Sequence, residues 1–195
     1  MSVPKIRISP AEYLAFERKS EIKHEFYNGE IFAMGGASRE HNLVCMNVSS
    51  EIRQQLKGKS CEAYPNDMRV FIPATGLYTY PDIVVVCGTP QFQDEEFDTL
   101  LNPVLIIEVL SPSTESYDRG KKFANYRSIE SLQEYLLIAQ DEYHIDRYLR
   151  HGEFWLLSEA RTLEESLELT SIECVLDMRE VYDKITFTTP EAETH

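Results

Sequence analysis

Two acidic residues lie beside apolar runs, where a carboxylate needs a compensating partner. Glu108 interrupts the run LIIEVL at residues 105–110, and a carboxylate there loses hydration unless a cation, a hydrogen-bond donor or a water-filled cleft compensates it. Asp82 directly precedes the run IVVV at residues 83–86. Two carboxylates on neighbouring strands suit a hard cation such as Mg²⁺, which retains waters and accepts phosphate oxygens. The pair therefore predicts a metal-dependent hydrolytic site.

Each acid taken alone also has a structural explanation. Asp82 can cap a turn, and Glu108 can pair with an arginine such as Arg69. The two acids together with the segment that follows them favour the functional interpretation.

That segment carries three polar residues at helical spacing. Asp118, Lys122 and Tyr126 are four residues apart, so a helix places them along one face. A lysine near a metal site can hold the nucleophile or offset the charge of a phosphoryl transition state. The alternative is a surface salt bridge on a solvated helix, which the spacing alone favours.

The surrounding elements can be predicted from local patterns. SPAE at residues 9–12 is a capping box that opens a helix to about residue 18, and Asn28-Gly29 predicts a β-hairpin. Apolar residues recur at helical spacing over 39–56. The remaining segments predict a helix over 117–128 and strands over 68–72, 83–87, 104–110, 134–139, 143–149 and 154–157. The pattern indicates an α/β fold, a mixed sheet flanked by helices, with the apolar strands 83–87 and 104–110 at its centre.

The length of 195 residues and the absence of a linker-like tract predict a single domain over 1–195. We divide it into a helix and hairpin at 9–34, a core at about 39–158 and a C-terminal extension at 159–195. The start lacks a signal-like apolar stretch, and every apolar run is too short to cross a bilayer, which predicts a cytoplasmic protein without a membrane partner. No C-x-x-C pair is present, and we expect buried free thiols, in preference to disulfides or a zinc site, at all four cysteines: Cys45, Cys61, Cys87 and Cys174.

The formal net charge of −14 bears on the substrate. It argues against tight, nonspecific DNA binding, which normally needs a basic surface, although a local basic cleft remains compatible with it. The sequence has no phosphate-binding P-loop, dinucleotide fingerprint, H-E-x-x-H or G-x-S-x-G motif. Nucleotide-cofactor enzymes and serine hydrolases are therefore disfavoured.

The acidic motifs also match a known pattern. In chain order they are YPDIVVV at 80–86, PVLIIEVLSPST at 103–114, then Asp118, Lys122 and Tyr126, then Glu134-Tyr135. Together they resemble the Uma-two family of restriction endonucleases, over most of the chain from the first helix to about residue 157. That family is similar to the PD-(D/E)xK nuclease superfamily, whose core is a mixed sheet flanked by helices.

The resemblance implies a metal-dependent endonuclease that hydrolyses phosphodiester bonds, with DNA as substrate and a homodimer as the assembly. It implies Asp82 and Glu108 as ligands of Mg²⁺ or Mn²⁺, with the Val109 backbone carbonyl as a third ligand. It also makes Glu25 a supporting ligand and His41 a cleft residue, and places Asp118 and Tyr126 in support. The alternatives are that Glu25 is only an exposed strand residue and that His41 only lies at the start of a helix.

The sequence departs from the superfamily at one position. The usual lysine, two residues after the second acid, is Leu110 here, and the resemblance assigns its role to Lys122. This departure and the acidic charge keep two alternatives open: a nuclease-fold module that only binds or assembles, and a hydrolase of a small phosphate compound.

Overall fold

A six-stranded mixed sheet forms the centre of the computed structural model, which describes residues 7–187. The strand order is β11-β10-β9-β8-β6-β3, with β8 and β9 parallel and the other neighbours antiparallel. The strands are β3 (Cys61–Pro65), β6 (Ile83–Cys87), β8 (Leu105–Leu110), β9 (Glu134–Ala139), β10 (Ile145–His151) and β11 (Phe154–Ala160). The predicted mixed sheet is confirmed, with the two apolar strands inside it.

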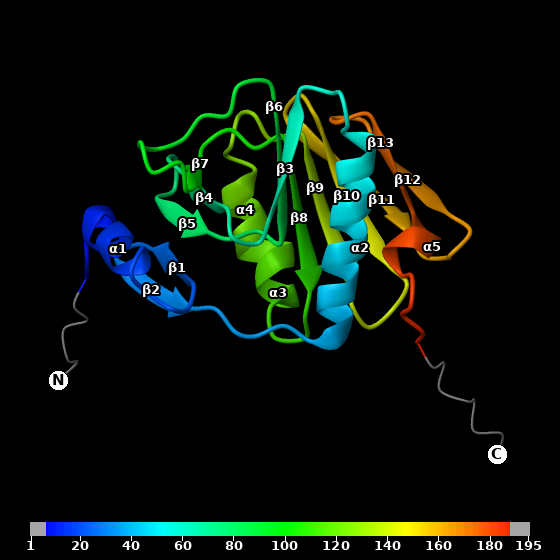
Figure 1. Ribbon diagram of the computed structural model, residues 1–195, viewed down its shortest axis with the longest axis horizontal. Helices are drawn as coiled ribbons and strands as arrows, with labels where there is room; N and C mark the ends of the chain where they lie inside the picture. Colours follow the sequence, from blue (N-terminus) through cyan, green and yellow to red (C-terminus); the bar gives the residue numbers. More distant parts are fainter. Residues whose placement is uncertain (1–6, 188–195) are drawn as a thin grey trace, which may run out of the picture.

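Helices cover both faces of this sheet (Figure 1). The helix α2 (Arg39–Gln55) buries Val44, Val48 and Ile52 against one face. The other face packs against a helical segment made of α3 (Glu115–Tyr117), the π-helical turn η1 (Asp118–Lys122) and α4 (Phe123–Tyr126). Because successive strand residues point to opposite faces, Ile107 joins the α2 side and Glu108 points to the other.

A second, five-stranded sheet adjoins the first and has the order β2-β1-β5-β4-β7. Its strands are β1 (His24–Tyr27), β2 (Glu30–Ala33), β4 (Arg69–Ile72), β5 (Leu77–Thr79) and β7 (Thr99–Leu100). Asn28 and Gly29 take positive φ values of 52° and 84°, as the predicted hairpin turn requires. The helix α1 (Pro10–Glu17) opens with the predicted capping box and packs Tyr13 against Phe26 and Tyr78.

The C-terminal part packs against α2. The hairpin of β12 (Ser166–Leu169) and β13 (Cys174–Asp177) and the short helix α5 (Met178–Val181) contribute Leu169, Leu176 and Val181 to the core that α2 covers. The polar end at 189–195, which the sequence predicts to be frayed, lies outside the described residues.

The expectation of four free thiols is wrong for one pair. Cys61 and Cys87 form a disulfide, whereas Cys45 and Cys174 are free. The two bonded residues lie directly opposite each other in the antiparallel pairing of β3 with β6. Strand β3 has the sequence CEAYP, which contains no β-branched residue and ends in proline, so local patterns did not indicate the strand that brings Cys61 to Cys87.

Within residues 7–187, no helix has the length and apolar character needed to cross a bilayer.

The packing of α2 predicts a contrast between two substitutions on that helix. Ile52 is 0% exposed, and Ile52→Ala should reduce the free energy of unfolding by about 2–5 kcal/mol because it leaves a cavity. Met46 is 68% exposed, and Met46→Ala should change it by less than about 0.5 kcal/mol. Urea unfolding followed by circular dichroism measures both; equal losses would contradict this packing.

Candidate active site

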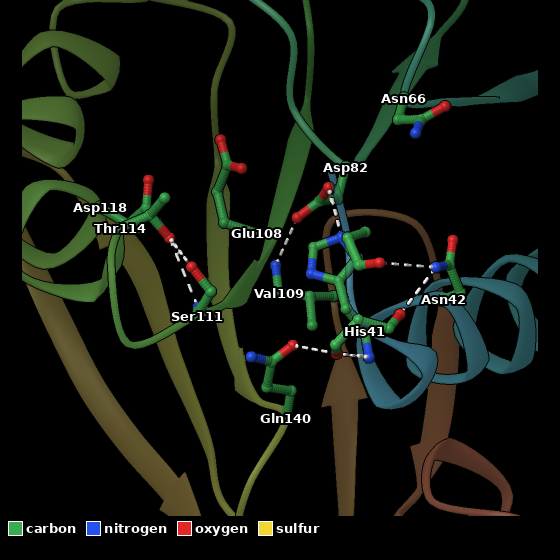
Figure 2. Close-up of polar contacts among 12 residues, drawn as sticks. His41, Asn42, Asn66, Asp82, Glu108, Val109, Ser111, Thr114, Asp118 and Gln140 are labelled. Carbon is green, nitrogen blue, oxygen red and sulfur yellow. Dashed lines mark hydrogen bonds and ion pairs between the residues drawn. The ribbon is translucent and has the colours of Figure 1, made fainter. Parts of the chain in front are cut away.

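Asp82 and Glu108 meet across two neighbouring strands. Ile83 and Ile107 are partners in the antiparallel pairing of β6 with β8, so the next positions, Asp82 and Glu108, also lie opposite each other. Asp82 is fixed by a hydrogen bond of 2.7 Å from the Val109 backbone N–H to its Oδ2 (Figure 2). The sheet thus brings together the two acids that the sequence singled out.

Glu108 is paired with residues of the helical segment and not with Arg69. Its side chain is nearly buried, and its Oε1 lies 2.9 Å from the Lys122 Nζ and accepts a 2.7 Å hydrogen bond from the Tyr126 hydroxyl. Arg69 instead pairs with Asp98 at 2.9 Å. The alternative that Glu108 pairs with Arg69 is therefore wrong.

The π-helical turn positions Lys122. Asp118 begins this turn and Lys122 ends it, with 3.5 Å between Asp118 Oδ1 and Lys122 Nζ. Both side chains are buried, so the alternative of a surface salt bridge on a solvated helix is wrong. π-Helical turns are rare and are often found at functional sites, and the sequence predicted a helix here without this irregularity.

Glu25 reaches the same ammonium group from the second sheet. Its Oε1 lies 3.3 Å from the Lys122 Nζ and accepts a hydrogen bond from the Thr79 hydroxyl. Strands β1 and β5, which carry Glu25 and Thr79, are neighbours. The structure thus places Glu25 with Glu108 and Asp118, although the three come from separate parts of the chain.

His41 lies on the other side of Asp82. It is in the first turn of α2, where its backbone N–H donates to the Ser38 cap, and its Nε2 is 3.1 Å from Asp82 Oδ1 (Figure 2). Cys45, one turn further along α2, belongs to the same cluster. Sequence reasoning missed Cys45, although its spacing of four from His41 on a helix could have indicated it.

A cavity of about 420 Å³ opens over these side chains. The polar residues that line it include Lys23, Glu25, Asp82, Glu108, Asp118 and Lys122. The predicted site residues therefore lie at this cavity, except Tyr126, which contacts Glu108 but does not line the cavity.

The charges of this site are not balanced. Burial raises the pKa of Glu108 to about 8; Lys122 opposes the rise, while Asp118 and Asp82 add to it. Burial also raises the pKa of Asp118 against the effect of Lys122. Burial lowers the pKa of Lys122, but Glu108, Glu25 and Asp118 outweigh it and hold that pKa well above its ordinary value.

Three carboxylates thus share one ammonium group, with Asp82 beside them. Carboxylate oxygens at the wall of a cavity are the ligands that Mg²⁺ and Mn²⁺ prefer, and a cation there would complete the charge balance. Asp82 and Glu108 fit such an ion. The role of the Val109 carbonyl stays a prediction; its backbone N–H holds Asp82.

The chain belongs to the Uma2 family, described as "Putative restriction endonuclease", whose model matches residues 10–179. It is 37% identical to the uncharacterized protein slr1290 of Synechocystis sp. over 187 residues, covering 95% of this chain and 97% of that protein. It is 40% identical to sll1609 of the same organism over 153 residues, covering 78% and 86%.

The solved structures show the same fold. A crystal structure of a "putative nuclease belonging to DUF820" from Anabaena variabilis matches with a TM-score of 0.74 and 19% identity, covering 89% of this chain and 97% of that chain. Family and fold together support a nuclease-like function for the chain.

The raised pKa of Glu108 predicts a pH dependence of stability in the presence of a chelator. Between the ordinary pKa of 4.5 and about 8, folded Glu108 keeps a proton that the unfolded chain has lost. Its contribution to the free energy of unfolding therefore falls as the pH rises through this window. Glu108→Gln should remove that fall, and exposed Glu168→Gln should not. Urea unfolding near pH 5 and near pH 8 measures the difference; the same fall in Glu108→Gln would refute the assignment.

Proposed function

We propose that this chain is a metal-dependent endonuclease that hydrolyses phosphodiester bonds of DNA. The observation that carries the proposal is the meeting of Asp82 and Glu108 across β6 and β8, with the Lys122 Nζ 2.9 Å from Glu108. The family description supports the reaction class. Phosphodiester hydrolysis needs metal ligands, a group that offsets negative charge, and space for the substrate, and this cavity has candidates for each.

Asp82 and Glu108 would hold Mg²⁺ or Mn²⁺, which supplies Lewis-acid polarisation of the phosphate and activation of a water. The neighbouring residues fix these two ligands. His41 and the Val109 N–H each bond one oxygen of Asp82, and the Tyr126 hydroxyl donates to Glu108. Such outer partners keep ligand oxygens in place and limit their rotation.

Lys122 takes the charge-offsetting role in this proposal. Leu110, at the position of the superfamily's usual lysine, is buried in the apolar cluster beneath α4. The leucine therefore packs in the core and cannot supply a positive charge. Lys122 brings its ammonium to Glu108 from the helical segment instead, where it can stabilise charge that develops on the phosphate.

The remaining parts of the proposal follow the family resemblance. We infer that the chain acts as a homodimer, so that two sites can serve the two strands of a duplex.

Hydrolysis of a small phosphate compound is the second candidate function. The cavity of about 420 Å³ lies in the size range of small-molecule sites, and the net charge of −14 disfavours a large polyanion. Both candidates use the same acids, so the substrate distinguishes them.

Cleavage of DNA tests the proposal. Wild type should cut linear or supercoiled DNA with Mg²⁺ or Mn²⁺ at low salt, and Asp82→Ala and Glu108→Ala should abolish the cleavage while circular dichroism shows that they stay folded. Exposed Glu168→Ala is the matched control and should cleave as wild type does. DNA cleavage that persists in both active-site variants would rule out the proposed site. Cleavage of a small phosphodiester but not of DNA would select the second candidate.

Lys122→Met should separate catalysis from metal binding. We expect turnover to fall by about 10²–10³-fold, because the variant loses the charge that stabilises the transition state, while Mn²⁺ affinity measured by calorimetry changes much less. Lys121→Met, which alters the exposed neighbour, should leave both quantities unchanged. If Lys122→Met lost Mn²⁺ binding as completely as turnover, Lys122 would only support the metal ligands and would not act in catalysis.

A further inference from the structure

A second group of ligand-type side chains lies next to the carboxylate cluster. One ligand atom each from His41, Cys45 and Asp82 lies within 4.8 Å of the other two. The helix α2 supplies His41 and Cys45, which are four residues apart and therefore on one face. Asp82 joins them from the start of β6. The three residues come from two rigid elements, which suits a preformed site.

The spacing is close to what one tetrahedral ion requires. Bonds of about 2.0–2.2 Å to nitrogen and oxygen place two ligands of one zinc ion roughly 3.4 Å apart. His41 Nε2 and Asp82 Oδ1 are 3.1 Å apart. Since the longest separation in the cluster is at most 4.8 Å, a contraction of about 1 Å brings all three atoms to one ion. Side-chain rotation can supply it.

The donor types differ from those of the neighbouring carboxylate cluster. Imidazole, thiolate and carboxylate suit a borderline-soft ion such as Zn²⁺ or Co²⁺, whereas Mg²⁺ prefers oxygen alone. His41 and Asp82 also line the cavity, so a fourth position can face water. The arrangement of three protein ligands with one open position is typical of zinc sites that take part in reactions.

Among the described residues, another group of ligand-type side chains lacks these properties. His144, Asp146 and Glu159 also have ligand atoms within 4.8 Å of one another, but Arg119 pairs with Asp146 and Arg161 with Glu159. Those two acids are already neutralised. In the described part of the chain, the ion-pair partner of Asp82 is His41 itself, so Asp82 retains its attraction for a cation.

We propose that His41, Cys45 and Asp82 form a binding site for a borderline-soft divalent cation, Zn²⁺ or Co²⁺, adjacent to the Mg²⁺ or Mn²⁺ position. Asp82 belongs to both positions, with Oδ1 facing His41. Binding releases the Cys45 thiol proton to solvent, because the thiolate is the ligand. These three ligands can bind the cation whether or not the chain cleaves DNA.

Cobalt absorption tests this site directly. Full-length protein with its disulfide intact is titrated with Co²⁺, and a thiolate-to-cobalt charge-transfer band in the near ultraviolet should saturate at one equivalent. Cys45→Ser should remove the band, and Cys174→Ser, the matched control at the other free cysteine, should keep it. His41→Ala should weaken binding at least about tenfold. Zn²⁺ should displace the cobalt and abolish the band.

Glu108→Gln separates this site from the neighbouring carboxylate position. A cobalt ion held by oxygen ligands alone gives no thiolate band, so the band reports only cobalt bound to Cys45. Because Glu108 is not a ligand of this ion, Glu108→Gln should keep the band. Absence of the band in wild type, or its persistence in folded Cys45→Ser, would overturn the proposal. Because the spectrum is measured without substrate, a protein that fails to cleave DNA can still show this site.

Discussion

Glu108 lies in the interior of a six-stranded sheet with 3% of its surface exposed, where an ionised carboxylate without a partner costs several kcal/mol. Lys122 provides the partner at 2.9 Å, and it too is buried. Lys122 favours the ionised form of Glu108 and is also held by Glu25 and Asp118, so packing of the helical segment on this face of the sheet supplies the positive charge that this site needs. Phe123 and Tyr126 hold it there by contacts with Tyr135 of β9. The apolar packing of the segment and the position of its charge therefore depend on each other.

A buried acid with a full set of partners has different surroundings in the same molecule. Glu134 is 0% exposed, and it receives Arg147 on one oxygen and the Ser171 N–H and hydroxyl on the other. One cation and two donors satisfy one carboxylate. At the candidate site, Lys122 is shared with Glu25 and Asp118 as well as Glu108. That excess of negative charge is unfavourable for folding, and it is the property expected of a group of residues that binds a cation.

The sequence indicated the parts of the fold that depend on local patterns. The capping box at Ser9, the Asn28-Gly29 turn and the apolar periodicity of α2 each act within a few residues, and these elements formed as predicted. Strands β5 and β7 are short, and β3 contains no β-branched residue. All three are defined by pairing with other segments, so they were missed. The Cys61–Cys87 bond was missed for the same reason, because it depends on the pairing of β3 with β6.

The candidate site was more accessible to sequence reasoning, because a charge inside an apolar run is itself a signal. Asp82 and Glu108 were found in this way, whereas Lys122 was assigned through the family resemblance. The structure places Glu108 and Lys122 in contact. The contribution of Thr79 to Glu25 and the proximity of Cys45 to Asp82 carry no such signal. They arise where separate elements meet, which local patterns do not encode. The roles of Asp82, Glu108, Lys122, Glu25 and Cys45 in binding or catalysis remain predictions.

The acidic charge of the chain bears on how a phosphate would be attracted to the cavity. Several arginines are already paired with acids: Arg18 with Asp94 and Asp98, Arg119 with Asp146, and Arg147 with Glu134. Of the two lysines that line the cavity, Lys122 is buried among carboxylates, and Lys23 pairs with Asp67. These side chains provide little free positive charge to a polyanion. Under the proposed function, the divalent cation at Asp82 and Glu108 therefore supplies attraction for the phosphate as well as chemistry. Substrate binding and catalysis would then depend on the same ion.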